Sequence, residues 1–320
     1  MSRRISTSET ADWLKERNDF LVLTHRRPDG DTLGCAGALA QGLRELGKTA
    51  YVLFNPEVTP RFQRFVEDYW APEGYKPKYV ITIDTASYDL FPKNCQEYID
   101  AVSLCIDHHL SNTYYAELTC LNADDASCGE TIYEILLAFA GGVSVKSAEC
   151  LYLALSTDTG CFSFANTTAN TLRVASLLIE AGAPHRDLNR LLFRTRSQSR
   201  IKIEGMIYSE IEYHFGGTVA ISKITKDMME DSNADEDDVD DIASIPGSID
   251  GVLAGITIRE LTSANDCKVS VRSSPLVNSH AICAHFGGGG HPMAGGFSLE
   301  KSIAEIIEAL LEVLGDFLPS

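Results

Sequence analysis

The segment THRRPDGDTLG at residues 24–34 begins at the last residue of the apolar run at residues 20–24 and leads directly into a stretch with helical periodicity. Ligands in open α/β sheets gather at the carboxyl ends of strands, where such a segment lies. His25, Asp29 and Asp31 offer one imidazole and two carboxylates within seven residues. The proline and glycine between them would bend the backbone so that the side chains converge. A divalent metal ion suits this donor set.

An ordinary helix entry is the alternative interpretation of this segment. In that case Asp31 caps the next helix and Asp29 shapes the turn before it. Three further positions in the chain carry metal-donor side chains and help to decide between the metal site and the helix entry. Asp84 follows a second apolar run, Asp107-His108-His109 follows a third, and Asp158 follows a helical stretch. A carboxylate that ends an apolar strand is costly to bury without a partner. Four such points together favour a metal site.

The first half of the chain alternates apolar runs with helical stretches. The further runs lie at residues 50–54, 79–83 and 102–106, and the helical stretches at residues 32–46 and 129–139. Nearly continuous apolar runs are typical of strands that are buried on both faces. The alternation predicts an α/β domain, a parallel sheet with flanking helices.

The second half changes character after residue 184. Helical periodicity at residues 147–157 and 168–181 is followed by a long mixed stretch that we interpret as a helical link. Strands are then expected at residues 207–213, 218–224, 251–259 and 268–272, with a glycine-rich loop at 287–290 and a final helix at 302–314. We therefore expect a catalytic metal-binding domain at 1–185, a helical linker at 186–204 and a smaller α+β domain at 205–320.

Composition limits the function classes. The chain has 320 residues and a formal net charge of −18, which argues against binding to long nucleic acid, since such binding depends on cationic side chains. No run is apolar enough to span a membrane and the N-terminus lacks a signal peptide, so we expect a cytoplasmic protein without a membrane partner. Nine cysteines without CxxC spacing are expected to be reduced and structural. The oligomeric state stays open, with a homodimer as one option.

The order HxxxDxD, an isolated Asp after a strand, DHH and then TDTG resembles the DHH phosphoesterase family over nearly the whole chain. In the second domain, FGGGGHPMAGG at residues 286–296 looks like the glycine-rich signature of the DHH-associated domain, with Gly295 where Ala is commoner. Within the family the chain is most similar to the two-domain nano-RNA exonuclease and pAp phosphatase type (NrnA-like).

The resemblance implies two divalent metal ions, with Mn²⁺ favoured and Mg²⁺ or Co²⁺ as weaker options. One ion would be held by His25, Asp29 and Asp84, and the other by Asp31, Asp84, His108 and Asp158. A water or hydroxide between two such ions becomes a nucleophile near neutral pH. Asp84 would bridge the ions, Asp107 would orient a histidine, and His109 would face the substrate phosphate as a catalytic group.

Substrate binding is expected in the second domain. Four consecutive glycines, Gly287, Gly288, Gly289 and Gly290, can bring backbone N–H groups close to an anion, and His291 adds a donor. Arg272 supplies a guanidinium suited to phosphate.

The resemblance implies hydrolysis of short oligoribonucleotides, including pApA, to 5′-mononucleotides, with pAp as a second substrate. A cyclic di-AMP phosphodiesterase is the nearest alternative. A manganese pyrophosphatase shares the metal motif, but the FGGGGH segment speaks against it. A nucleotide-binding protein without catalysis comes from a different class, and the complete ligand set makes it the weaker hypothesis.

Overall fold

The computed structural model describes residues 2–239, 242–261 and 266–319. The chain forms two compact units, Met1–Thr195 and Arg196–Ser320. The stretch predicted as a helical link is helical for most of its length, through α7 (His185–Asn189), a π-helix (Arg190–Arg194) and the start of α8 (Gln198–Ser209). None of the helices in these described ranges is both long and apolar enough to cross a membrane.

The first unit is built on a six-stranded sheet with the order β1-β6-β5-β4-β2-β3, and all of its neighbouring strands are parallel. The predicted α/β fold with a parallel sheet is confirmed. The strands are β1 (Arg3–Arg4), β2 (Phe20–Leu23), β3 (Ala50–Val52), β4 (Tyr79–Ile83), β5 (Val102–Asp107) and β6 (Leu118–Leu121).

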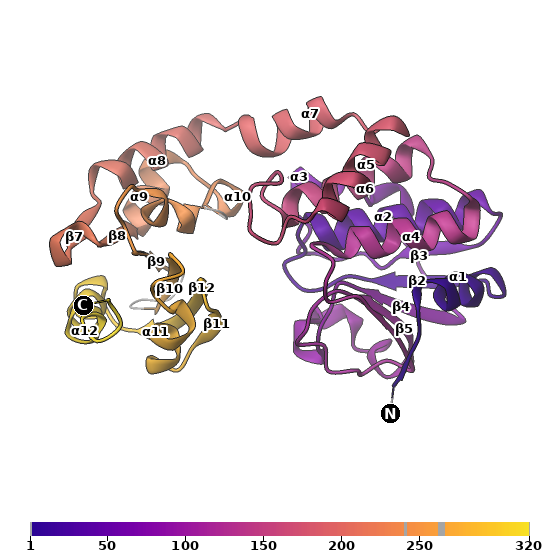
Figure 1. Cartoon of the computed structure of the whole chain (residues 1–320), viewed down its shortest axis with the longest axis horizontal. Coiled ribbons are helices and arrows are strands. Elements are labelled where there is room, and N and C mark those ends of the chain that lie inside the picture. Colours follow the sequence, from indigo (N-terminus) through magenta and orange to yellow (C-terminus); the bar gives the residue numbers. More distant parts are fainter. Residues whose placement is uncertain (1, 240–241, 262–265, 320) are drawn as a thin grey trace. The chain divides into compact units, whose positions relative to one another are not determined.

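Both faces of this sheet are buried, as the continuous apolar runs require. Phe20 and Val22 of β2 belong to the large core under the long helices, whereas Leu21 and Leu23 belong to a second core on the opposite face. The α-helices are α1 (Thr7–Lys15), α2 (Gly30–Glu45), α3 (Pro60–Gln63), α4 (Cys128–Ala140), α5 (Val145–Asp158) and α6 (Ala169–Glu180). In Figure 1, α2, α4, α5 and α6 lie together on one side of the sheet. Two short 3₁₀-helices contribute to the core on the other face, Lys93–Cys95 with the buried Cys95 and Ile99–Ala101 with Ile99 packed against it.

The second unit contains a mixed six-stranded sheet with the order β11-β12-β10-β9-β8-β7. Among the described strands of this second sheet, only β8 and β9 pair in parallel. The elements are β7 (Glu212–His214), β8 (Val219–Ile224), α9 (Lys226–Ser232), α10 (Glu236–Val239), β9 (Ala254–Glu260), β10 (Asp266–Ser273), α11 (Ser279–His285), β11 (Gly289–His291), β12 (Ala294–Glu300) and α12 (Ile303–Leu314). This is the predicted smaller α+β arrangement.

Two local predictions in this unit were wrong. The strand expected at residues 207–213 begins too early, because α8 continues to Ser209 and buries Ile203 and Ile207, and only Glu212 and Tyr213 of this range belong to a strand, β7. The segment 287–290 is only partly a loop, since Gly289 and Gly290 belong to β11 and pair with Gly296 and Gly295 of β12. A side chain on Gly290 would meet the Ala294 carbonyl oxygen at 2.4 Å, so the pairing depends on glycine.

Candidate metal centre

Neighbouring parallel strands bring the predicted donors to one edge of the first sheet. β2, β4 and β5 lie side by side, and His25, Asp84 and His108 each follow the carboxyl end of one of them. Asp31 lies in the first turn of α2 and Asp158 is the last residue of α5. Donor atoms of His25, Asp29 and Asp84 lie within 4.8 Å of one another, and so do those of Asp31, His108 and Asp158. All six residues predicted as metal ligands therefore lie in two adjoining groups.

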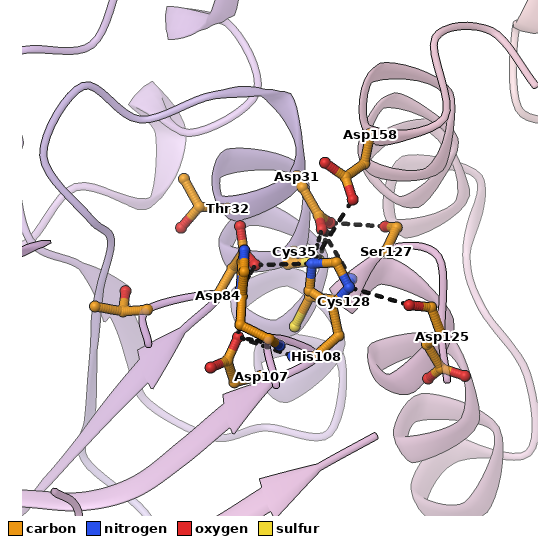
Figure 2. Close-up of polar contacts among 12 residues, drawn as sticks. Asp31, Thr32, Cys35, Asp84, Asp107, His108, Asp125, Ser127, Cys128 and Asp158 are labelled. Carbon is orange, nitrogen blue, oxygen red and sulfur yellow. Dashed lines mark hydrogen bonds and ion pairs between the residues drawn. The ribbon is translucent and has the colours of Figure 1, made fainter. Parts of the chain in front are cut away.

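The two oxygens of Asp84 face different imidazoles. Asp84 Oδ2 lies 3.7 Å from His25 Nε2, whereas Asp84 Oδ1 lies 3.4 Å from His108 Nε2. His108 Nε2 is also 3.6 Å from Asp31 Oδ2 and 3.6 Å from Asp158 Oδ2. Figure 2 shows the His108 ring among the carboxylates of Asp31, Asp84 and Asp158. Asp84 thus stands between the two donor groups, as a bridging ligand would.

Asp84 is also unusual in burial and backbone conformation. Its side chain is 3% exposed, and Oδ1 has no hydrogen-bond partner among the described residues. Its φ of +53° lies in the left-handed region, and its backbone N–H donates to the Ile106 carbonyl across the sheet. A buried carboxylate oxygen without a donor is costly unless a cation balances it. This oxygen fits a metal ion.

The charges around Asp84 also favour a metal ion. Burial and the nearby carboxylates of Asp84 and Asp158 raise the pKa of Asp31 well above its usual range, and burial with Asp84 raises that of Asp158 to about 7. Burial alone would lower the pKa of His25, but the neighbouring carboxylates of Asp29 and Asp84 raise it to about 11. So much negative charge in one buried place favours the binding of cations.

Asp29 performs two roles. Its Oδ1 accepts hydrogen bonds from the backbone N–H groups of Asp31 and Thr32, which makes Asp29 the N-cap of α2. The same oxygen lies 3.6 Å from His25 Nε2. The helix-entry interpretation is therefore correct about a cap but assigns it to the wrong residue, and the cap places Asp29 beside the histidine.

His109 is held by Asp107. The buried Asp107 Oδ1 accepts a hydrogen bond from His109 Nδ1 at 2.8 Å and from the backbone N–H of His108 at 2.8 Å. The other carboxylate oxygen accepts from the Asn112 amide at 2.6 Å. The Asp107 bond raises the pKa of His109, so that the ring carries a proton more readily. Because Nδ1 is used by Asp107, Nε2 is the nitrogen left to meet a substrate.

Sequence reasoning missed the groups that hold Asp31. Ser127 Oγ donates to Asp31 Oδ1 at 2.8 Å, the Cys128 N–H donates to Oδ2 at 2.8 Å and the Gly129 N–H donates to Oδ1 at 3.2 Å. The Cys35 thiol also donates to Oδ1, and burial raises the pKa of Cys35 and Cys128 well above the usual range, so both stay thiols rather than metal-binding thiolates. The only sequence feature that could have indicated these contacts to Asp31 is a serine at a helix start, shortly after an acidic pair.

In the second unit, the structure places Arg272 and His291 in one row. Arg272 of β10 and His291 of β11 both pair in register with Ala294 of β12, one from each side. Directly opposed residues of antiparallel strands point to the same face, so both side chains lie on one face, with the small side chain of Ala294 between them. Among the described residues no carboxylate pairs with Arg272, whose pKa is lowered by burial. A half-buried guanidinium without a counter-charge is suited to an anion.

Comparison with known proteins agrees with this architecture. Residues 19–155 match the DHH family, N-terminal domain, and residues 216–319 match the DHHA1 domain. The chain is 31% identical over 305 residues to the bifunctional oligoribonuclease and PAP phosphatase NrnA of Thermus thermophilus, covering 92% of this chain and 89% of that one. It is 30% identical over 305 residues to the Bacillus subtilis protein of the same name, covering 92% and 95%.

A solved structure shares the fold. The crystal structure of an exopolyphosphatase-related protein from Bacteroides fragilis superposes with a TM-score of 0.83 at 22% identity, covering 97% of this chain and 96% of that one. Both sequence relatives and the structural neighbour span both units. The chain therefore belongs to the DHH family.

Proposed function

We propose that this chain is a metal-dependent phosphoesterase that hydrolyses short oligoribonucleotides to 5′-mononucleotides and removes a phosphate from pAp. The observation that carries the proposal is the pair of donor groups that meet at Asp84. The two relatives that are about 30% identical over nine-tenths of the chain are both oligoribonucleases and PAP phosphatases, which supports the substrate class.

We propose His25, Asp29 and Asp84 as the ligands of one metal ion, and Asp31, Asp84, His108 and Asp158 as those of a second. Imidazole and carboxylate donors without a thiolate favour Mn²⁺, with Mg²⁺ or Co²⁺ as alternatives. When bound, such ions activate water near neutral pH and neutralise the charge that develops on a phosphoryl group.

The protein's own groups would orient the reaction. Asp107 holds the His109 ring at 2.8 Å, and this ring is 40% exposed. His109 can therefore reach a substrate and deliver a proton from Nε2 to the oxygen that leaves phosphorus. Such a proton transfer typically accelerates a reaction by about 10²–10⁴-fold.

The second unit is proposed to select the substrate. Arg272 would bind a phosphate, and the glycines of 287–290 with His291 would bring backbone and side-chain donors to the same anion. Arg272 and His291 share one face of the sheet, which supports this assignment.

All nine cysteines are free thiols, and eight of them are buried. Unpaired cysteines are typical of proteins in reducing compartments, so we propose a cytoplasmic location.

A substrate comparison tests the proposal. Purified protein with Mn²⁺ would be given pApA, pAp, a five-nucleotide RNA, cyclic di-AMP and pyrophosphate in parallel, with a chelator-treated sample as the control. We expect pApA and pAp to be hydrolysed fastest. Preferential opening of cyclic di-AMP would support the alternative phosphodiesterase, and failure to hydrolyse any of the five would refute the enzymatic assignment.

A further inference from the structure

Glu130 is a buried charged residue to which the reaction proposed above assigns no role. It lies in the first turn of α4 and is 1% exposed. Its Oε1 accepts hydrogen bonds from the Ala126 N–H at 3.1 Å and the Thr171 hydroxyl at 2.7 Å, and Oε2 accepts from the Asn170 amide at 2.7 Å. All three donors are uncharged. A buried carboxyl group whose partners are all neutral is rarely the most stable choice for packing alone, so we look for a role of Glu130 in holding the local geometry.

The next peptide group along the chain, which carries the Ala126 carbonyl, is held as well. Asn166 Nδ2 donates to the Ala126 carbonyl at 3.1 Å and to the Asp158 carbonyl at 3.1 Å. Glu130 therefore holds the Ala126 N–H, and Asn166 holds the carbonyl. We call Glu130 and Asn166 the Ala126 clamp.

The residues beside Ala126 carry the contacts that orient two proposed metal ligands. The Asp125 carbonyl accepts from His108 Nδ1 at 3.1 Å, which leaves His108 Nε2 free for a metal ion. On the other side, Ser127 and Cys128 donate to the two oxygens of Asp31. Figure 2 shows Asp125 and Ser127 beside the His108 ring and the Asp31 carboxylate.

The turn after Asp158 explains why Asn166 also binds the Asp158 carbonyl. Gly160, Cys161 and Phe162 have consecutive φ values of +55°, +56° and +65°. The left-handed region is unfavourable for Cys and Phe, so this turn requires support from its surroundings. Asn166 supplies part of that support by binding the Asp158 carbonyl, which ends α5.

We propose that the Ala126 clamp positions Asp31, His108 and Asp158 for metal binding. Glu130 and Asn166 are positioning residues in this proposal, since neither donates an atom to the donor groups. The inference rests on the metal centre of the proposed function. Groups that orient ligands typically change metal affinity by about 10–100-fold when they are removed.

The test is a Mn²⁺ titration of the metal-free full-length protein, with free Mn²⁺ counted by electron paramagnetic resonance. The variants are Asn166→Ala and Glu130→Gln. Asn166 lies at the surface, so its loss should leave the protein folded, and a glutamine at 130 cannot accept from all three donors. Asn94→Ala is the matched control, because Asn94 is exposed and its amide donates to the Phe54 carbonyl within the same unit.

We expect the Mn²⁺ dissociation constant to rise about tenfold or more in Asn166→Ala, and to rise in Glu130→Gln. The Asn94→Ala value should stay within twofold of wild type, and thermal melts should show that the metal-free variants are folded. Wild-type affinity in a folded Asn166→Ala protein would overturn the clamp alone. A wild-type protein that binds no Mn²⁺ would overturn the clamp and the proposed metal centre together.

Discussion

Asp84 Oδ1 lies 3.4 Å from His108 Nε2, although the two residues follow different strands. The contact exists because β4 and β5 are parallel neighbours whose carboxyl ends meet. Asp84 turns its other oxygen toward His25, so one buried carboxylate serves both donor groups. This shared position gives Asp84 a larger expected effect on metal binding than any other proposed ligand.

Asp84→Asn should abolish hydrolysis of pApA and reduce the bound metal by about one ion or more, since the amide weakens contacts to both sites. Asparagine tolerates positive φ, so the backbone at position 84 should be preserved. Metal analysis and activity assays check the outcome. Asp19→Asn is the control, because Asp19 has a φ of +66° and pairs with Lys78 outside the donor groups. Normal metal content in Asp84→Asn would remove Asp84 as the bridge.

His109→Gln separates a catalytic histidine from a metal ligand. Donor atoms of His109 also lie within 4.8 Å of those of Asp84 and His108, so the geometry alone admits both roles. If His109 moves a proton, kcat should fall by about 10²–10⁴-fold while Mn²⁺ binding stays near wild type. Loss of a bound ion in this variant would instead make His109 a ligand.

Asp158→Asn should change how the stability of the metal-free protein depends on pH. The folded-state pKa of about 7 exceeds the unfolded value of about 4, so the folded protein holds this proton more tightly. The free energy of unfolding of the wild type should therefore fall as pH rises through this range, and the loss is complete above pH 7.

In the presence of chelator, the melting temperature of Asp158→Asn should fall less between pH 5 and pH 8 than that of wild type. The exposed Asp12→Asn should follow the wild type. An equal fall in all three proteins would show that Asp158 ionises normally.

Arg272→Ala should raise KM for pApA at least tenfold with a smaller effect on kcat, because the lost contact is with bound phosphate. Arg272→Lys keeps the charge but loses the planar donor pair, so an intermediate KM is expected. A change confined to kcat at saturating substrate would contradict a role in substrate binding.

Much of the first unit could be predicted because its strands are continuous apolar runs that end abruptly in His or Asp. Burial on both faces of β2, β4 and β5 produces such runs. Asp84, His108 and Asp158 could be grouped for the same reason, since each interrupts an apolar segment at its end. The edge strand β1 and its neighbour β6 offered no comparable run and were missed.

Other features depend on contacts that no local pattern encodes. Helix α8 exposes Ile201 and Tyr208 while it buries Ile203 and Ile207, so its apolar residues do not mark one face and a strand seemed plausible. Ser127, Glu130 and Asn166 act through hydrogen bonds to groups that lie 4 to 96 positions away in the chain. Only the folded structure brings these partners together.

The most direct test of the two-metal account is to titrate metal-free protein with Mn²⁺ and to follow bound Mn²⁺ and pApA hydrolysis in the same samples. We expect two bound ions per chain, with hydrolysis absent before metal is added and complete only when both sites are filled. Full hydrolysis in the presence of chelator, or with no more than one ion bound, would contradict it.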